Sequence, residues 1–247
     1  MAPPQMLTGL TYKNALNCVA VLIHILASIN YGGPGGMEWL NSIREFGKFE
    51  TIVTPTDATF YVRDIILYFN VTFGICQMLP KYSSGEIVQE GITYWFFAAT
   101  AAQVISTIFF SFDSLMGFFF STVILGGMVF CFIKILLNQS SGSVDEVQHS
   151  PEEYWLLRFP FSLQAGWYIC IFISSVNNVL VRTGFGNYPW VQVLLALICF
   201  VAFAGVAAKC LMFNGENPNY VIPAVIAIFT VSSTGLDRHW HPIYHEK

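Results

Sequence analysis

The stretch that decides the fold is SLMGFFFSTVILGGMVFCFI, residues 114–133, which holds 20 consecutive residues without an Asp, Glu, Lys or Arg. An α-helix rises about 1.5 Å per residue, so about 20 apolar residues cross a hydrocarbon core about 30 Å thick. The stretch is too long for a strand of a membrane barrel and shows no alternating period. It therefore predicts a membrane-spanning α-helix.

Further windows of similar length are equally poor in charge. Five of them contain no Asp, Glu, Lys or Arg, and one carries charge only near its start; these are 14–37, 91–112, 159–181, 183–208, 217–236 and, with charge at its start, roughly 57–79. A helix satisfies its backbone hydrogen-bonding groups within one segment, as a lipid environment requires. The sequence therefore predicts an all-α fold, a polytopic helical membrane bundle of about seven transmembrane helices.

The composition also indicates a membrane protein. Charged residues make up 11% of the 247 residues, against about 25% in soluble domains, and hydrophobic residues reach 55%. The formal net charge is −4 and no basic run occurs, which argues against a nucleic-acid partner. The six cysteines form no Cys-x-x-Cys pair, so neither a zinc site nor a disulfide framework is expected.

Polar stretches divide the chain into parts. We predict a five-helix part at 1–182 that includes a polar loop at 138–158, two additional transmembrane helices at 183–236, and a C-terminal tail at 237–247. The first apolar window lacks a preceding basic segment and a small-residue cleavage site, so we expect a retained helix and no cleaved signal peptide. Lys and Arg are spread evenly between the two sides of such a bundle, which leaves its orientation and its organelle open.

Arg63 and Asp64 form the most conspicuous charged pair, because they lie inside the predicted second helix. If that helix begins near Pro55, the pair lies about 12 Å along it. Ionisable side chains within a membrane are costly and face a cavity, a partner or the headgroup boundary. Two interpretations stay open: a polar anchor for a ligand or a neighbouring subunit, or an interfacial ion pair with Arg63 reaching toward water.

Other predicted helices contain single polar side chains. Gln103 and Asn177 need hydrogen-bond partners in lipid, and such amides often bond across helices with about 0.6–2 kcal/mol. They are either helix–helix contacts or ligand contacts. His24 is either a ligand of a pigment's metal ion or a helix histidine with a satisfied hydrogen bond. The tail histidines match no established metal-binding pattern, so no metal site is predicted.

Three groups of residues resemble the translocator and tryptophan-rich sensory protein family (TspO/MBR-related). They are TPTDATF at 54–60 with IILY at 65–68, FPFSLQAGW at 159–167 with Asn177, and Gln103 with Phe109 and Phe110. They are similar to the family's second, fifth and third helices, in that order. The resemblance covers roughly residues 10–182 and leaves the last two helices as an extension, which is the extended seven-helix form of the family.

The resemblance implies a non-catalytic integral membrane protein whose bundle binds a hydrophobic or tetrapyrrole-like ligand or a lipid. No cofactor follows from the residues alone; a bound lipid, sterol or tetrapyrrole is what the resemblance implies. The residues that would line or shape the site are Pro55, Phe60, Arg63, Asp64, Gln103, Trp167 and Asn177. One position departs from the family pattern, because Arg63 and Asp64 stand where its second helix usually carries a tryptophan.

The alternative is a structural accessory subunit of a larger respiratory or photosynthetic membrane complex. The large apolar faces and the missing family tryptophan motivate it, and its partners would be membrane lipids and other membrane protein subunits. An enzyme, a receptor or a channel has less support, because no nucleophile–base constellation appears. The window 217–236 also contains no Lys for a retinal Schiff base.

Overall fold

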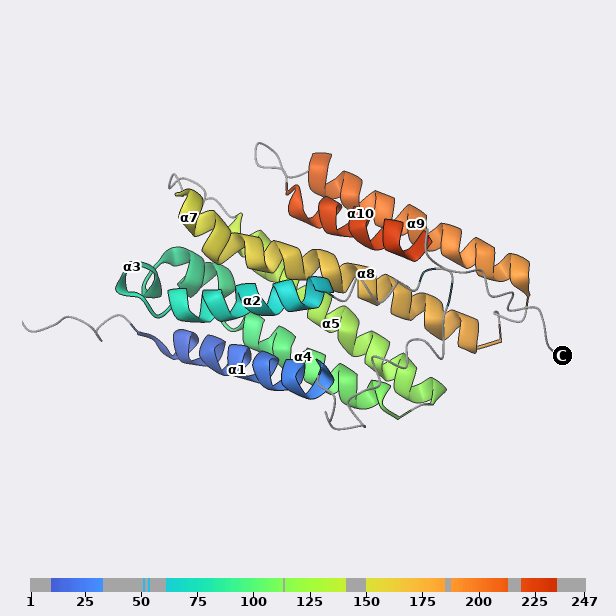
Figure 1. The fold of residues 1–247 in the computed structure, drawn as a ribbon, viewed down its shortest axis with the longest axis horizontal. Coiled ribbons are helices and arrows are strands. Elements are labelled where there is room, and N and C mark those ends of the chain that lie inside the picture. Colours follow the sequence, from blue (N-terminus) through green and yellow to red (C-terminus); the bar gives the residue numbers. More distant parts are fainter. Residues whose placement is uncertain are drawn as a thin grey trace, which may run out of the picture.

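The computed structural model describes residues 10–32, 51, 53, 61–112, 114–140, 150–184, 188–212 and 219–234. Within these residues every regular element is a helix, and no strand is present. The long helices run lengthwise beside one another in an elongated bundle (Figure 1). The predicted all-α helical bundle is therefore confirmed.

The first half of the chain supplies four long helices joined by short ones. The long helices are α1 (Tyr12–Gly32), α2 (Tyr61–Cys76), α4 (Trp95–Phe110) and α5 (Leu115–Gln139). The short α3 (Pro80–Ser83) and the π-helix η3 (Ile87–Ile92) lie between α2 and α4. A tight turn joins α4 to α5, and there Ser114 caps α5 because its Oγ accepts a hydrogen bond from the backbone N–H of Gly117 at 3.0 Å.

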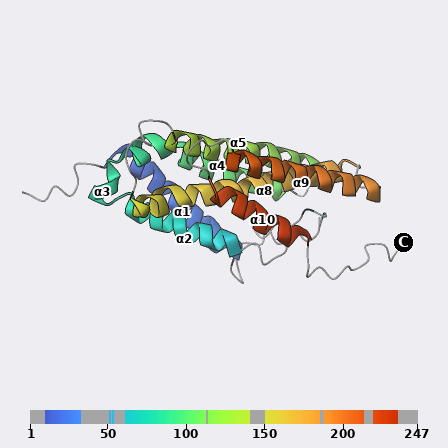
Figure 2. The same ribbon diagram turned by 90° about the horizontal axis from the view of Figure 1, so that it is seen from above.

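The second half begins with one continuous helical segment, Pro151–Arg182. It consists of α7 (Pro151–Glu153), the π-helix η4 (Tyr154–Arg158) and α8 (Phe159–Arg182), and it is followed by α9 (Pro189–Met212) and α10 (Val221–Thr234). Both views of the ribbon place α8 in the middle of the bundle, and it contacts α2, α5, α9 and α10 (Figures 1 and 2).

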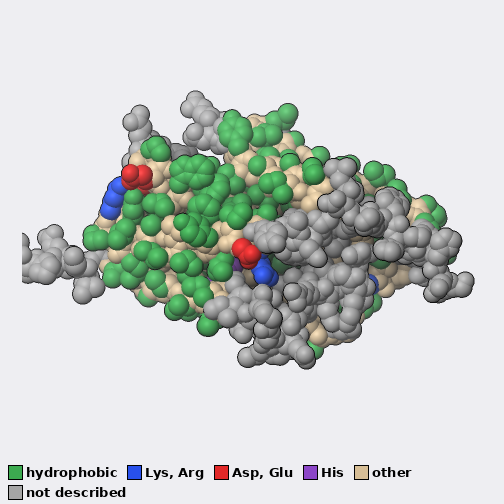
Figure 3. Space-filling model, in the orientation of Figure 1, with side chains coloured by type: hydrophobic (Ala, Val, Ile, Leu, Met, Phe, Trp, Pro, Cys, Tyr) green, Lys and Arg blue, Asp and Glu red, His purple; other side chains and the backbone are tan. Residues whose placement is uncertain are grey.

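Among the described helices, three are long and apolar enough to cross a membrane by length and composition, namely Leu115–Gln139, Pro151–Arg182 and Pro189–Met212. Shorter apolar helices cover Tyr12–Leu26, Trp95–Phe110 and Val221–Ser233. The described side chains on the face in Figure 3 are mostly hydrophobic, with few charged ones. These features are those of a membrane protein, while the number of seven crossings stays a prediction.

Among the differences between helix boundaries and predicted windows, two have a visible structural cause. The window 91–112 begins inside η3, and α4 starts only at Trp95 because the backbone breaks at Thr93, which has φ 51°. Helical backbone also extends into both ends of the predicted polar loop 138–158. At its far end the Oγ of Ser150 accepts a hydrogen bond from the N–H of Glu153 at 3.3 Å, which starts a helix there.

Aromatic rings and amides join the helices in the core. Phe73 of α2, Phe96 of α4 and Phe161 of α8 pack edge to face, with ring centroids 5.0–5.7 Å apart. Such pairs contribute about 0.5–1.5 kcal/mol beyond their buried area. A further link joins α2 to α8, where the Nε2 of Gln164 donates a hydrogen bond to the Oδ1 of Asn70 at 2.7 Å. These contacts hold α8 against the first half of the chain.

The helix α10 approaches α8 closely at Gly166. A Cβ atom at this position would meet the Cβ of Val225 at 3.0 Å and the Cα of Ile222 at 3.3 Å. The ring of Phe229 also packs against Trp167, with centroids 5.8 Å apart. The last helix is therefore packed into the core of the bundle.

Candidate functional site

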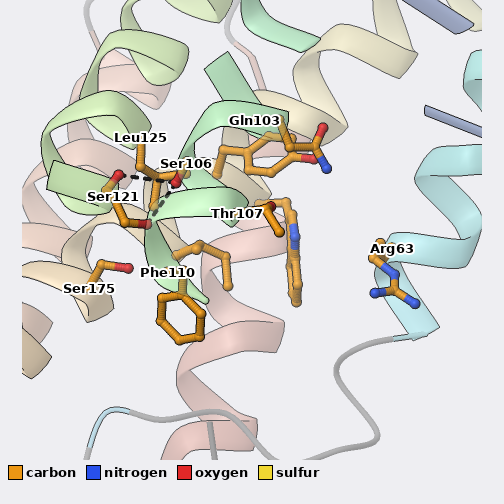
Figure 4. A pocket seen from close by; sticks show the side chains of 11 residues that line it. Arg63, Gln103, Ser106, Thr107, Phe110, Ser121, Leu125 and Ser175 are labelled. Atoms are coloured by element: carbon orange, nitrogen blue, oxygen red, sulfur yellow. Dashed lines mark hydrogen bonds between the residues drawn. The ribbon is translucent and has the colours of Figure 1, made fainter. Parts of the chain in front are cut away.

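A cavity of about 90 Å³ lies between α2, α4, α5 and α8. Its lining residues are Arg63, Gln103, Ser106, Thr107, Phe110, Ser121, Leu125, Trp167, Tyr168, Ile171 and Ser175. Figure 4 shows Arg63 and Gln103 on one side of this group, with Leu125, Ser121 and Phe110 on the other. The cavity therefore has a polar side and a more apolar side.

The cavity lies beneath the end of the bundle where α4 turns into α5. At about 1.5 Å per residue, Ser106 is about 6 Å from the end of α4, and Leu125 is about 15 Å from the start of α5. The site thus lies within about 15 Å of this end of α4 and α5.

Hydroxyl groups form part of the wall between α4 and α5. The hydroxyls of Ser106 and Ser121 are 2.9 Å apart, and the Oγ of Ser106 also donates to the carbonyl oxygen of Ser121 at 3.0 Å. Within the described part of the chain, no hydrogen bond links the side chain of Thr107 or Ser175 to a protein group. These two hydroxyls are therefore able to bind a molecule in the cavity.

Arg63 is the cationic group of the lining, and it is half-buried. Its Nε is buried without a hydrogen-bond partner among the described residues. No salt bridge joins it to Asp64, and the ion pair found within the described residues is Lys81–Glu152, with an Nζ–Oε2 distance of 2.8 Å. Asp64 is exposed and does not line the cavity. Among the described residues Arg63 and Asp64 therefore form no salt bridge with each other, and an interfacial position of Arg63 stays a prediction.

His24 of α1 lies beside the polar side of the cavity. Its buried side chain is close enough to Gln103 and Arg63 for electrostatic interactions. Its Nε2 is buried without a partner among the described residues. No group of three potential metal ligands occurs in the described ranges. Polar side chains from α1, α2 and α4 converge at this place.

Asn177 has a different surrounding. Its Nδ2 donates a hydrogen bond to the Oγ1 of Thr51 at 3.0 Å, and both residues are buried. The carbonyl oxygen of Val53 accepts from the Oγ of Ser174 on α8 at 3.5 Å and from the Oγ of Ser233 on α10 at 3.1 Å. Asn177 thus helps to dock residues 51 and 53 against α8 and α10, and it does not line the cavity.

The structure brings three of the seven predicted site residues to one cavity: Arg63, Gln103 and Trp167. Asp64 and Asn177 lie elsewhere, and Pro55 and Phe60 lie outside the described residues. Sequence reasoning missed the hydroxyl residues Ser106, Thr107, Ser121 and Ser175. The available signal was the spacing of Ser106, Thr107 and Phe110 from Gln103, three, four and seven residues on, which puts them on one helix face.

Fold and cavity together define a helical integral membrane protein with an internal, partly polar site. A family model described as TSPO-like protein matches residues 14–234. The chain belongs to this TSPO-like family, which confirms the predicted relationship. The match continues through α9 and α10, beyond residue 182, where the recognised motifs ended. Comparisons with curated proteins and with solved structures give no match.

Proposed function

We propose that this TSPO-like membrane protein is a non-catalytic binding protein that holds a hydrophobic ligand or a lipid in the cavity between α2, α4, α5 and α8. One observation carries the proposal. Arg63, Gln103 and Trp167, which belong to three different helices, line the same cavity. A concave site with apolar walls and a few convergent polar groups is typical of ligand-binding sites.

The size of the cavity bears on the kind of ligand. Its volume is about 90 Å³, and it is partly open to the outside. Sites that enclose drug-sized molecules measure about 300–1,000 Å³. A flat tetrapyrrole would need the helices to separate, whereas a narrow group such as the end of a lipid fits. The volume therefore favours a lipid or a slender apolar molecule over a tetrapyrrole.

The chemistry of the lining supports binding as its role. The described lining combines a guanidinium, one amide, hydroxyls and apolar side chains, and it includes no Cys, His, Asp or Glu. These groups donate hydrogen bonds and exclude water. A general base paired with a nucleophile, as covalent catalysis requires, is not among the lining residues.

Native mass spectrometry of the purified protein in phosphatidylcholine nanodiscs tests the proposal. Leu125→Phe places a larger side chain in the cavity, and Val123→Phe is the matched control because Val123 is 55% exposed on the outside of α5. We expect the wild type and Val123→Phe to retain a bound hydrophobic molecule, and Leu125→Phe to lose it. Retention by Leu125→Phe, or its absence from the wild type, would refute the proposal. Absorbance of the same samples would reveal a tetrapyrrole.

A second candidate function, an accessory subunit of a larger respiratory or photosynthetic membrane complex, rests on the outer face of α9. Val193, Leu197 and Val201 of this helix are 51–71% exposed. Lipid or a neighbouring subunit would cover them. Extraction in a mild detergent, followed by size separation and mass spectrometry, tests this role. Migration with a large assembly supports it, and migration as a lone chain refutes it.

A further inference from the structure

We infer that the ligand of the cavity is an amphiphile whose anionic oxygen group, a carboxylate or a phosphate, pairs with Arg63, while its apolar body lies along α5 and α8. This inference rests on the function proposed above and names the chemical class of the ligand. It is carried by the charge, the polar groups and the apolar wall of the same cavity.

The charge of Arg63 calls for a partner of opposite charge. A guanidinium stays protonated in proteins, and an ionised side chain within a membrane needs a partner because transfer from water is costly. Among the described residues Arg63 has no carboxylate partner, and its buried Nε has no hydrogen bond. The described lining contains no Asp or Glu. An anion in the cavity would supply the missing partner.

Neutral hydrogen-bond donors line the cavity together with Arg63. Gln103 and Thr107 are presented by α4, and Figure 4 shows them between Arg63 and the group of Leu125, Ser121 and Phe110. A carboxylate has two oxygens with about four sites for hydrogen bonds, and an arginine occupies two of them at most. The amide N–H of Gln103 and the hydroxyl of Thr107 are donors for the remaining sites. A neutral ligand would use these donors but would leave the charge of Arg63 without a counterion.

The remaining wall of the cavity is apolar. Leu125 and Ile171 line the cavity from α5 and α8, and Phe110 lies with Leu125 on the side away from Arg63 (Figure 4). A volume of about 90 Å³ holds a head group and a few carbon atoms, so a longer body must continue between the helices toward the lipid. An alkyl chain is narrow enough for this path, which favours a chain over a ring system.

Binding of matched probes tests the inference. Octanoate and octanol share an apolar chain and differ in head-group charge, so their affinities for the protein in phosphatidylcholine nanodiscs are compared after subtraction of binding to empty nanodiscs. We expect the wild type to bind octanoate about tenfold or more tightly than octanol, because hydrogen bonds to charged groups are strong. Octyl phosphate, as a third probe, distinguishes a phosphate from a carboxylate as the preferred head.

Variants connect this preference to the site. Arg63→Gln should remove the preference for octanoate and leave the affinity for octanol within about twofold. Asp64→Asn, one position along the same helix and outside the cavity, should leave both affinities unchanged. Gln103→Leu keeps the charge of Arg63 and should weaken the affinity for octanoate about 3–10-fold. This second variant tests the inference even if Arg63→Gln fails to fold.

The outcomes separate the inference from the proposed function. Equal affinities for octanoate and octanol in the wild type, or an unchanged preference in Arg63→Gln, overturn the anionic ligand. Octanol binding that is lost in Leu125→Phe would in that case still support the cavity as a binding site. If the wild type binds neither octanol nor octanoate, both ideas fail.

Discussion

The amide pair between α2 and α8 provides a sharp prediction, because its two members are unequally supported. The Nε2 of Gln164 donates to the Oδ1 of Asn70 at 2.7 Å and also to the carbonyl oxygen of Pro160 at 3.3 Å. The Nδ2 of Asn70 donates to the Oε1 of Gln164 at 3.4 Å, and both amides are fully buried. Asn70 therefore has Gln164 as its partner, whereas Gln164 has a second one.

Because Gln164 has a second partner among the described residues and Asn70 does not, the two single variants should lower the free energy of unfolding by different amounts. Gln164→Met leaves both polar atoms of Asn70 without a described partner, and we expect the free energy of unfolding to fall by about 2–3 kcal/mol. Asn70→Val leaves only the Oε1 of Gln164 unpaired, and we expect it to lower the free energy of unfolding by about 1 kcal/mol. The double variant leaves no buried amide at this place, so it should be more stable than Gln164→Met alone.

Reversible unfolding in mixed micelles, followed by circular dichroism at increasing fractions of denaturing detergent, measures these energies. Thr72→Val is a control, because Thr72 is half-buried on α2 and its exposed hydroxyl donates to the carbonyl oxygen of Tyr68 in the same helix. It should change stability by less than about 0.5 kcal/mol. Equal costs for the two single variants, or additive costs in the double variant, would refute the reasoning.

Two further predictions concern a close approach and a docked segment. Gly117→Ala should destabilise by about 1–3 kcal/mol, because its Cβ would lie 2.6 Å from the carbonyl oxygen of Phe109. Gly127→Ala, with no neighbour within 4 Å, should be neutral or stabilising by up to about 1 kcal/mol in the same unfolding assay; equal costs at both glycines would contradict this. Asn177→Ala should cost about 1 kcal/mol through its bond to Thr51, and no change in stability would show that this bond is dispensable.

The helical fold could be predicted from the sequence because charge-free windows of membrane length leave few alternatives. The start of α4 could not be predicted from the sequence. Gly91 to Tyr94 are apolar or small like the residues that follow, so hydropathy does not reveal the break at Thr93 or the π-helix before it. Such breaks depend on backbone geometry and on neighbouring elements.

Part of the cavity could be predicted because large polar side chains are conspicuous in apolar helices. Arg63 and Gln103 were recognised in this way, while the hydroxyl residues were not. Ser and Thr occur often in membrane helices and bond to their own backbone, as Thr122 does to the carbonyl oxygen of Phe118 at 2.8 Å. Asn177 is an amide in an apolar helix like Gln103, and its contact with Thr51 is what separates their roles.

The hydrogen bond between Ser233 and the carbonyl oxygen of Val53 has a consequence for biogenesis. Its partners are 180 residues apart in the chain, so the ribosome must release α10 before the bond can form. Until α10 has been made, Val53 lacks this contact. The docking of Val53 onto α10 is therefore a late step in the assembly of the bundle.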